Sequence, residues 1–330
     1  MKGERPVWDV LVVGAGPTGI AVGAEARRAG LSALLIDKGP VTSSLLDFPT
    51  FMSFFTTRDR LEIANVPFSV PDDKPDRRQA LVYYRAVVRH YDLTVRTHEE
   101  VIAAERTEDG FTVQTRRRDG EQRHRARAVV VATGYFGQPR RLGVPGEDQD
   151  WVRVRYREPF EHFGEHVALI GAGNSACEAA LELWRNGVEV TLIHRRAEIK
   201  PTVKYWVKPD MENRIAEGAI EVHFDTAVEA FEDREILATR NGESVRIAVD
   251  AAYVLIGYSI DAKLLRRCGI EVSEGDLIPS FDEATGESNV PGFYVAGAVR
   301  SGVHTNRIFI DNSREHGKAI VAHIAARLGT

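Results

Sequence analysis

Two glycine-rich turns, each between an apolar strand and a helix, limit the folds open to this chain. The first is Gly14-Ala15-Gly16-Pro17-Thr18-Gly19, which follows a predicted strand over residues 9–13 and precedes the helical pattern of residues 20–29. The second is Gly171-Ala172-Gly173-Asn174-Ser175-Ala176, between a predicted strand over 166–170 and a predicted helix over 177–186. A strand–turn–helix context is what a dinucleotide fingerprint requires. Two such units predict an α/β protein with two Rossmann-like, three-layer domains and two bound dinucleotides.

The glycines of the first turn have separate roles in such a fingerprint. Gly14 permits the tight turn, Gly16 lets the backbone approach a pyrophosphate, and Gly19 lets the helix pack closely on the strand. The pyrophosphate would lie at the N-terminus of the helix, where backbone N–H groups and the helix dipole favour an anion.

The residues that end the next strand differ between the two units. Residues 31–36 end at Asp37, followed by Lys38. A carboxylate at this spacing accepts hydrogen bonds from a ribose hydroxyl, although a solvated acid at a strand end is the alternative. Residues 188–193 end instead at His194-Arg195-Arg196. Arginines bind a 2′-phosphate that a carboxylate would repel, which favours NADP(H) over NAD(H). The alternative is a basic, solvated turn.

The later strands indicate a discontinuous domain. Residues 249–256 and 293–296 are predicted strands, and residues 312–328 form a predicted closing helix. We therefore assign residues 1–152 and 258–330 to the domain of the first fingerprint. Residues 153–257 form an inserted domain that carries the second.

Composition excludes several classes of function. The net charge of −5 gives no indication of a nucleic-acid or membrane partner. The two cysteines, Cys177 and Cys268, form no C-x-x-C, so neither a redox dithiol nor a metal site is predicted. We expect no signal peptide, because a core strand is predicted from residue 9, and no apolar run approaches the ~20 residues of a membrane span. We expect a cytoplasmic protein.

Several segments resemble the thioredoxin-reductase-like flavoproteins over nearly the whole chain: V-V-V-A-T-G at 129–134, H-R-R at 194–196 and F-Y-V-A-G at 293–297. This resemblance implies FAD in the first site and NADPH in the second. It also implies that the turns at Thr133-Gly134 and Gly297-Ala298 approach the FAD, and that the backbone around Val101 meets its adenine.

The chain lacks the dithiol of thioredoxin reductase and is more similar to the bacilliredoxin reductases, also called bacillithiol disulfide reductases. This resemblance implies NADPH, FAD and an acceptor that is a low-molecular-weight disulfide or a small bacilliredoxin-type protein. A homo-oligomer is usual among such relatives. No catalytic acid or base is identified. The segments that carry the resemblance are residues 48–68, 77–88, 156–159, 173–183, 308–312 and 316–317.

Thr18 departs from this family. The bacilliredoxin reductases typically have Cys at this position, giving G-P-C-G where this chain has G-P-T-G. A hydroxyl forms neither a thiolate nor a disulfide. If the family's route runs through that thiol, this protein reduces its substrate directly from the flavin, uses another acceptor, or has lost the activity.

Three other functions remain as alternatives. A ferredoxin– or flavodoxin–NADP reductase also lacks the dithiol, but such enzymes often carry a C-terminal aromatic residue, and this chain ends H-I-A-A-R-L-G-T. A flavin monooxygenase also has two fingerprints, but its F-x-G-x-x-x-H-S stretch is absent from residues 150–163. The third alternative is a non-enzymatic, NADPH-responsive redox sensor.

Aromatic and polar side chains that could face the flavin have two interpretations each. The irregular segment 40–75 contains several phenylalanines, which either fill the core of the loop or form a wall against a flat ring. Tyr135 and Phe136 either line the flavin or belong to the core. His304 and Asn306 follow the Gly297 turn, and either could face the ring, although a structural role is the more common one for a lone histidine. The phenylalanines of the segment are Phe48, Phe51, Phe54, Phe55 and Phe68.

Overall fold

A computed structural model describes residues 6–330 and divides them into two compact units. The first unit comprises the described residues up to Asp47 together with residues 52–138 and 258–330. The second comprises residues 48–51 and 139–257. Residues 139–152, expected in the first domain, lie in the second because Trp151 and Val152 pack in one core with Phe231 and Ile236. The prediction of mixed α/β structure with two Rossmann-like domains is confirmed.

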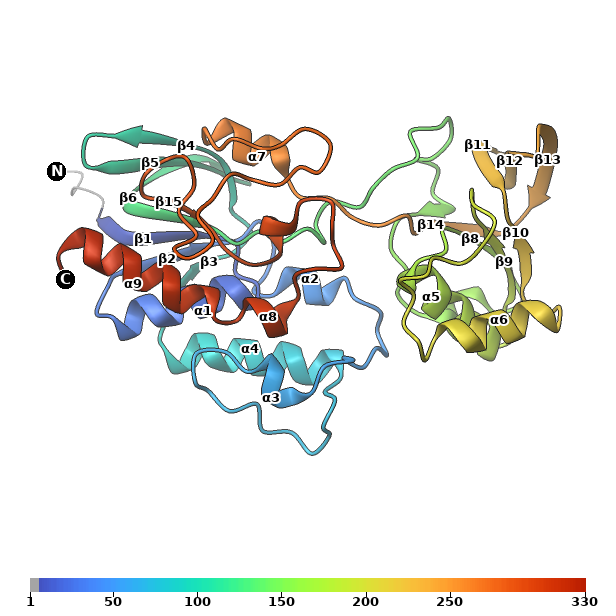
Figure 1. The fold of residues 1–330 in the computed structure, drawn as a ribbon, viewed down its shortest axis with the longest axis horizontal. Coiled ribbons are helices and arrows are strands. Elements are labelled where there is room, and N and C mark those ends of the chain that lie inside the picture. Colours follow the sequence, from blue (N-terminus) through green and yellow to red (C-terminus); the bar gives the residue numbers. More distant parts are fainter. Residues whose placement is uncertain (1–5) are drawn as a thin grey trace. The chain divides into compact units, whose positions relative to one another are not determined.

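A seven-stranded sheet forms the centre of the first unit (Figure 1). Its order is β3-β2-β1-β6-β5-β4, and β15 pairs with β6. The strands β3, β2, β1 and β6 run parallel, and β4, β5 and β6 are antiparallel. The strand bounds are β1 (Val7–Val13), β2 (Ala33–Ile36), β3 (Thr94–Arg96), β4 (Glu100–Thr107), β5 (Gly110–Arg117), β6 (Gly120–Val131) and β15 (Phe293–Val295).

Strand β6 joins the two parts of this sheet. The sequence pattern suggests a hairpin strand at 122–126 and a separate strand at 127–132, but residues 120–131 form one strand. Its first half alternates buried and exposed residues and pairs with β5. For example, His124 of β6 pairs with Val113 of β5. Its last four residues are all buried, and Val131 pairs with both Val13 and Val295. The change from alternating to continuous apolar sequence follows the change from an antiparallel to a buried parallel arrangement.

Helix α1 (Pro17–Arg28) follows the first glycine turn and contacts both α4 (Arg77–His90) and α9 (His316–Leu328) (Figure 1). A capping box starts α4, in which Asp76 and Gln79 each accept from the other's backbone N–H. The helix expected at 312–328 is two helices, α8 (Ile310–Ser313) and α9. The remaining short helices are α2 (Ser43–Leu46), α3 (Arg58–Leu61), α7 (Ala262–Arg267) and the 3₁₀ helix η2 (Gly297–Ser301).

The second unit contains a parallel sheet of order β10-β9-β8-β14-β7 and a separate antiparallel sheet of order β11-β12-β13. Helix α5 follows the second glycine turn, as α1 follows the first. The bounds are β7 (Val152–Arg153), η1 (Pro159–His162), β8 (His166–Ile170), α5 (Asn174–Arg185), β9 (Glu189–Ile193), α6 (Lys208–Ala216), β10 (Glu221–His223), β11 (Thr226–Glu232), β12 (Glu235–Arg240), β13 (Glu243–Ala248) and β14 (Ala251–Val254).

Four of the five phenylalanines of segment 40–75 fall into two groups. Phe54 and Phe68 are buried, and Phe68 stacks on Tyr83 of α4 with ring centroids 4.1 Å apart. This supports the loop-core interpretation for these two residues. Phe51 and Phe55 are 56% and 40% exposed, so they do not fill that core.

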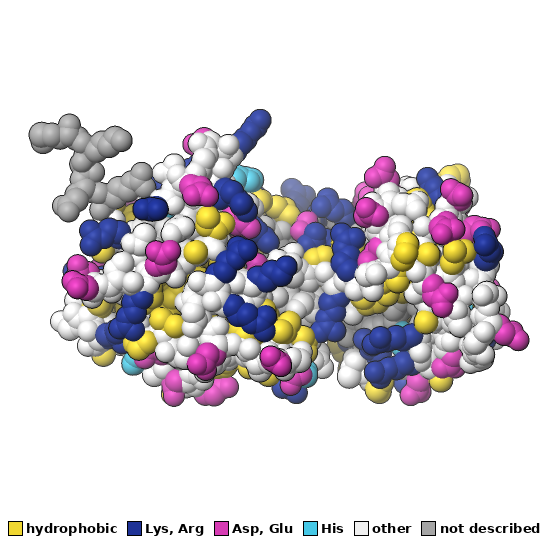
Figure 2. All heavy atoms as spheres, turned by 90° about the horizontal axis from the view of Figure 1, so that it is seen from above, with side chains coloured by type: hydrophobic (Ala, Val, Ile, Leu, Met, Phe, Trp, Pro, Cys, Tyr) yellow, Lys and Arg dark blue, Asp and Glu magenta, His cyan; other side chains and the backbone are white. Residues whose placement is uncertain are grey.

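The described residues contain no helix that is long and apolar enough to cross a membrane. On the face that Figure 2 presents, basic and acidic side chains are interspersed. This distribution agrees with the small net charge of −5.

Candidate dinucleotide-binding sites

The three glycines of the first turn meet different surroundings. A Cβ built on Gly14 would lie 2.6 Å from the Ala132 carbonyl oxygen, and one built on Gly19 would lie 2.0 Å from the Gly14 oxygen. The fold itself therefore requires glycine at both positions. A Cβ on Gly16, in contrast, would have no neighbour within 4 Å among residues 6–330. The open space beside Gly16 fits the approach of a ligand phosphate to the backbone.

The second turn repeats this arrangement. A Cβ built on Gly171 would lie 2.5 Å from the Leu255 oxygen, whereas the nearest described atom to one built on Gly173 is Lys200 Cδ at 3.9 Å. In both turns the first glycine is enclosed by the fold and the middle glycine faces open space. Ala176, at the place of Gly19, is fully buried. Both turns thus have a cradle that would fit a pyrophosphate at the start of a twelve-residue helix.

Alanine at the middle glycines should separate ligand binding from folding. We expect Gly16→Ala to weaken FAD binding while the apoprotein unfolds at the wild-type temperature, because its backbone has φ −79° and its added methyl meets no described atom. Gly173→Ala is the matched variant, and it should weaken NADPH binding without changing FAD affinity. Titration of the apoprotein with each nucleotide, with thermal unfolding alongside, measures both. If either variant weakened the binding of FAD and NADPH equally, the assignment of one nucleotide to each glycine turn would be contradicted.

Asp37 holds the first turn in place. Its Oδ2 accepts from the Ala15 N–H at 2.8 Å, and its Oδ1 accepts from the Gly39 N–H at 2.8 Å and the Ser43 hydroxyl at 3.1 Å. An ionised carboxylate has about four acceptor sites, so capacity for one ribose hydroxyl remains. The ribose role stays a prediction. The adjacent Lys38 is exposed, and its Nζ lies 3.2 Å from a Cβ built on Gly137.

The other residues predicted to meet FAD lie near the ends of strands in the same sheet. Thr133 and Gly134 follow β6, and Gly297 and Ala298 follow β15, which pairs in parallel with β6. The carboxyl ends of parallel strands are where open α/β sheets bind ligands. Val101 is buried at a register shift between β4 and β5, a bulge that interrupts the strand pairing. Their contact with FAD remains a prediction.

A cluster of basic groups follows β9 at the second site. Burial and the neighbouring Lys200 and Arg196 lower the pKa of His194, and its Nε2 is a buried atom with no hydrogen-bond partner in the described chain. Partial burial and the charges of Arg196 and Arg140 lower the pKa of Lys200. Mutual repulsion of this kind is relieved by an anion, so the cluster fits a phosphate group. The predicted Arg195 and Arg196 are both exposed at its edge.

Sequence motifs do not identify Lys200 as a binding residue, because it lies outside the H-R-R motif. Its backbone N–H donates to the Ala172 oxygen at 3.1 Å, which returns the chain to the glycine turn. The Asn174 side chain holds the same loop: its Oδ1 accepts from the Lys204 N–H at 2.9 Å, and its amide donates to the Thr202 oxygen at 3.5 Å. Asn174 therefore offers a ligand its backbone N–H rather than its side chain. Ser175 is exposed in the same first turn of α5.

Thr18 is held between α8 and the Gly297 turn. Its Oγ1 lies 3.1 Å from Ser313 Oγ, and the Ser313 hydroxyl donates to the Phe309 oxygen at 2.6 Å. Because the Ser313 proton is used in that bond, the Thr18 hydroxyl is the donor to Ser313. Thr18 Oγ1 would also lie 2.7 Å from a Cβ built on Gly297.

The two cysteines are not placed for redox chemistry. Both are buried, and burial raises the pKa of Cys177 to about 12 and that of Cys268 to about 11. Thiols with such values carry almost no thiolate at neutral pH, and the thiolate is the reactive form. The burial of Cys177 and Cys268 is typical of structural thiols.

Three of the remaining candidates, Tyr135, Phe136 and His304, have partners within the protein. The Phe136 ring stacks on Tyr258 at 4.3 Å between centroids, and Tyr135 lies 6.2 Å from the same ring. Burial raises the pKa of Tyr135 to about 12. His304 Nε2 lies 3.2 Å from Asp276 Oδ1, which gives His304 a structural contact.

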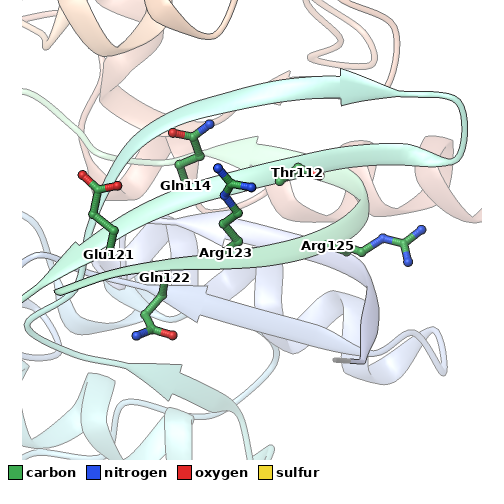
Figure 3. Close-up of a pocket in the computed structure, with 6 residues that line it drawn as sticks. All are labelled: Thr112, Gln114, Glu121, Gln122, Arg123 and Arg125. Atoms are coloured by element: carbon green, nitrogen blue, oxygen red, sulfur yellow. The ribbon is translucent and has the colours of Figure 1, made fainter. Parts of the chain in front are cut away.

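A pocket on the β5–β6 hairpin is separate from both glycine turns. Figure 3 shows Gln114, Glu121 and Arg123 projecting to one side of the hairpin and Gln122 to the other. Its lining combines acidic and basic groups and shares no residue with either fingerprint. We assign it no part in dinucleotide binding.

Each unit has an open glycine cradle between a strand in parallel pairing and a helix, which is the geometry of a dinucleotide-binding site. Residues 11–297 match the family model described as pyridine nucleotide-disulphide oxidoreductase. The chain is 35% identical over 320 residues to the bacilliredoxin reductase Bdr of Bacillus subtilis, covering 96% of this chain and 97% of the relative. It matches the structure of the bacillithiol disulfide reductase Bdr from Bacillus cereus with a TM-score of 0.95 at 35% identity, covering 98% and 100% of the two chains. A ferredoxin–NADP reductase of Thermus thermophilus is 27% identical over 304 residues, 88% of this chain and 84% of the relative.

This protein belongs to the pyridine nucleotide-disulphide oxidoreductase family. It is an oxidoreductase, and membership in this family implies a flavin and a nicotinamide nucleotide as cofactors. The resemblance to the thioredoxin-reductase-like flavoproteins, and to the bacilliredoxin reductases among them, is confirmed.

Proposed function

We propose that this protein is an NADPH-dependent FAD enzyme whose acceptor is a low-molecular-weight disulfide of the bacillithiol type or a small bacilliredoxin-type protein. The observation that carries the NADPH assignment is the basic cluster of His194, Arg196 and Lys200 beside an open glycine cradle. The acceptor assignment is supported by relatives that are 35% identical over nearly the full chain and are named for that substrate or partner.

The proposed cofactors divide between the two units. The residues that would hold FAD lie in the first unit, residues 6–47, 52–138 and 258–330, and those for NADPH lie in residues 139–257. When bound, FAD accepts a hydride from NADPH and passes two electrons to the acceptor. The chain itself provides N–H groups at the starts of α1 and α5 for the pyrophosphates, and Arg195 and Arg196 for the 2′-phosphate.

The surroundings of the thiols restrict how a disulfide could be reduced. Both cysteines of the chain are buried with raised pKa values, and Thr18 presents a hydroxyl. No thiolate of this protein is therefore available to attack a disulfide sulfur. We infer that electrons reach the acceptor without a mixed disulfide between the acceptor and this chain.

An acceptor panel tests the proposal. The FAD-loaded protein is mixed with NADPH, and NADPH consumption is followed after adding bacillithiol disulfide, oxidised bacilliredoxin, glutathione disulfide, ferredoxin or flavodoxin. We expect bacillithiol disulfide or bacilliredoxin to accelerate consumption well above the rate with oxygen alone. No acceleration by either would remove this function. Release and chromatography of the bound flavin identifies FAD independently.

A ferredoxin– or flavodoxin–NADP reductase is the second candidate, supported by the Thermus thermophilus relative. Rapid reduction of ferredoxin or flavodoxin, with slow reduction of the disulfides, would favour it. Slow turnover with every acceptor, together with an NADPH-dependent change in assembly state, would favour a redox sensor. We further propose a cytoplasmic homo-oligomer, which cell fractionation and sedimentation of the holoprotein would test.

A further inference from the structure

The backbone N–H of Gly297 is bound by a histidine from a helix later in the chain. Gly297 follows β15, is buried and has φ +75°. Its N–H donates to His316 Nδ1 at 3.0 Å. On its other side, a Cβ built on Gly297 would lie 2.7 Å from Thr18 Oγ1. The glycine is therefore held between Thr18 and His316.

The position of His316 is itself fixed by close packing of two helices. His316 is the first residue of α9, and Gly317 follows it. A Cβ built on Gly317 would lie 3.1 Å from backbone atoms of Ala21 and Val22 in α1. The start of α9 therefore lies against the backbone of α1, which sets where the imidazole reaches Gly297.

The hydrogen bond determines the form of the histidine. Because Nδ1 accepts from Gly297, the proton of the neutral ring is on Nε2. Burial and the charge of Arg300 lower the pKa of His316 to about 4. The ring is neutral at physiological pH, so Nδ1 stays available as an acceptor.

We propose that His316 is a positioning residue for the flavin: it accepts the Gly297 N–H and so fixes the Gly297-Ala298 turn in the orientation that meets bound FAD. This inference rests on the proposed function, in which that turn approaches FAD. His316 acts through Gly297, whose buried N–H would otherwise have to find another acceptor.

Three variants test this role. We expect His316→Ala to weaken FAD binding to the apoprotein by about tenfold, because the turn that would meet FAD loses the acceptor that fixes its buried N–H. The visible absorption and circular dichroism of the bound flavin should also change. His316→Asn should retain most of the affinity and the spectrum, because its side-chain oxygen can replace Nδ1 as acceptor. His323→Ala is the matched control, because His323 lies on the same helix as His316 and its Nδ1 lies 2.9 Å from the hydroxyl of Tyr294 in β15.

The measurements are FAD titration of the apoprotein, flavin spectra and thermal unfolding without ligand. Wild-type FAD affinity and spectra in His316→Ala would overturn the proposal. The proposal would also be overturned if His316→Asn bound FAD as weakly as His316→Ala, or if His323→Ala weakened FAD binding equally. None of these measurements needs NADPH or an acceptor, so a failed acceptor panel leaves this result intact. A wild-type protein that binds no FAD would instead refute the proposed function.

Discussion

Replacing Arg195 and Arg196 together by alanine is expected to raise the KM for NADPH about a hundredfold, because two charge-assisted hydrogen bonds would be lost and each contributes about 1.5 kcal/mol at an exposed position. The KM for NADH should change little, since NADH has no 2′-phosphate. Steady-state rates with each nucleotide, using whichever acceptor is most active, provide the measurement.

A matched control removes two arginines from the same unit but away from the glycine turn. Arg185 is exposed at the C-terminal end of α5, and Arg246 is exposed on β13 and pairs with Glu235; their replacement by alanine should leave both KM values unchanged. Equal increases for NADPH and NADH in the Arg195/Arg196 variant would refute the 2′-phosphate assignment. A smaller, NADPH-selective increase in Lys200→Ala would identify Lys200 as part of the same anion site.

The second large effect is expected from Thr18→Cys. Position 18 is the second residue of α1, where the helix N-terminus stabilises a thiolate. A thiolate can attack a disulfide sulfur, whereas the threonine hydroxyl cannot. We therefore expect a strong increase in the rate of bacillithiol disulfide reduction, with FAD affinity unchanged because a cysteine is no larger than the threonine it replaces.

Thr18→Ser is the appropriate control for this substitution. It keeps the hydroxyl that donates to Ser313 and removes only the methyl group. It should bind FAD like the wild type and show no gain in disulfide reduction. An unchanged rate in Thr18→Cys would show that the missing thiol does not limit the reaction. An equal gain in Thr18→Ser would attribute the effect to the lost methyl group instead.

The environment of Cys177 differs from that of position 18. Cys177 lies in the first turns of α5 but is buried, and burial raises the pKa of its thiol to about 12. A position near a helix N-terminus therefore does not by itself create a reactive thiol. The half-buried position 18 combines the helix N-terminus with access to the Gly297 turn.

The local elements of this protein could be predicted from sequence because they depend on neighbouring residues. The strand before Gly14, the glycine turn and α1 form one continuous stretch, and the same holds for the strand before Gly171 and for α5. The sequence also shows that the two units differ after their second strands, since Asp37 directly follows one and His194-Arg195-Arg196 directly follow the other. Fold class and the expectation of two dinucleotides followed from these short-range patterns, and the family followed from the resemblance of longer segments along the chain.

The tertiary structure decided what depends on residues far apart in the chain. Thr18 and Ser313 are 295 positions apart, and their contact gives the threonine a partner that no local pattern indicates. Gly297 meets His316 only because Gly317 allows α9 to lie against α1. Lys200 reaches the basic cluster through a loop that returns to Ala172. Periodicity and motif spacing record only which residues share an element, whereas these contacts arise from packing between elements, which the sequence specifies only through the whole fold.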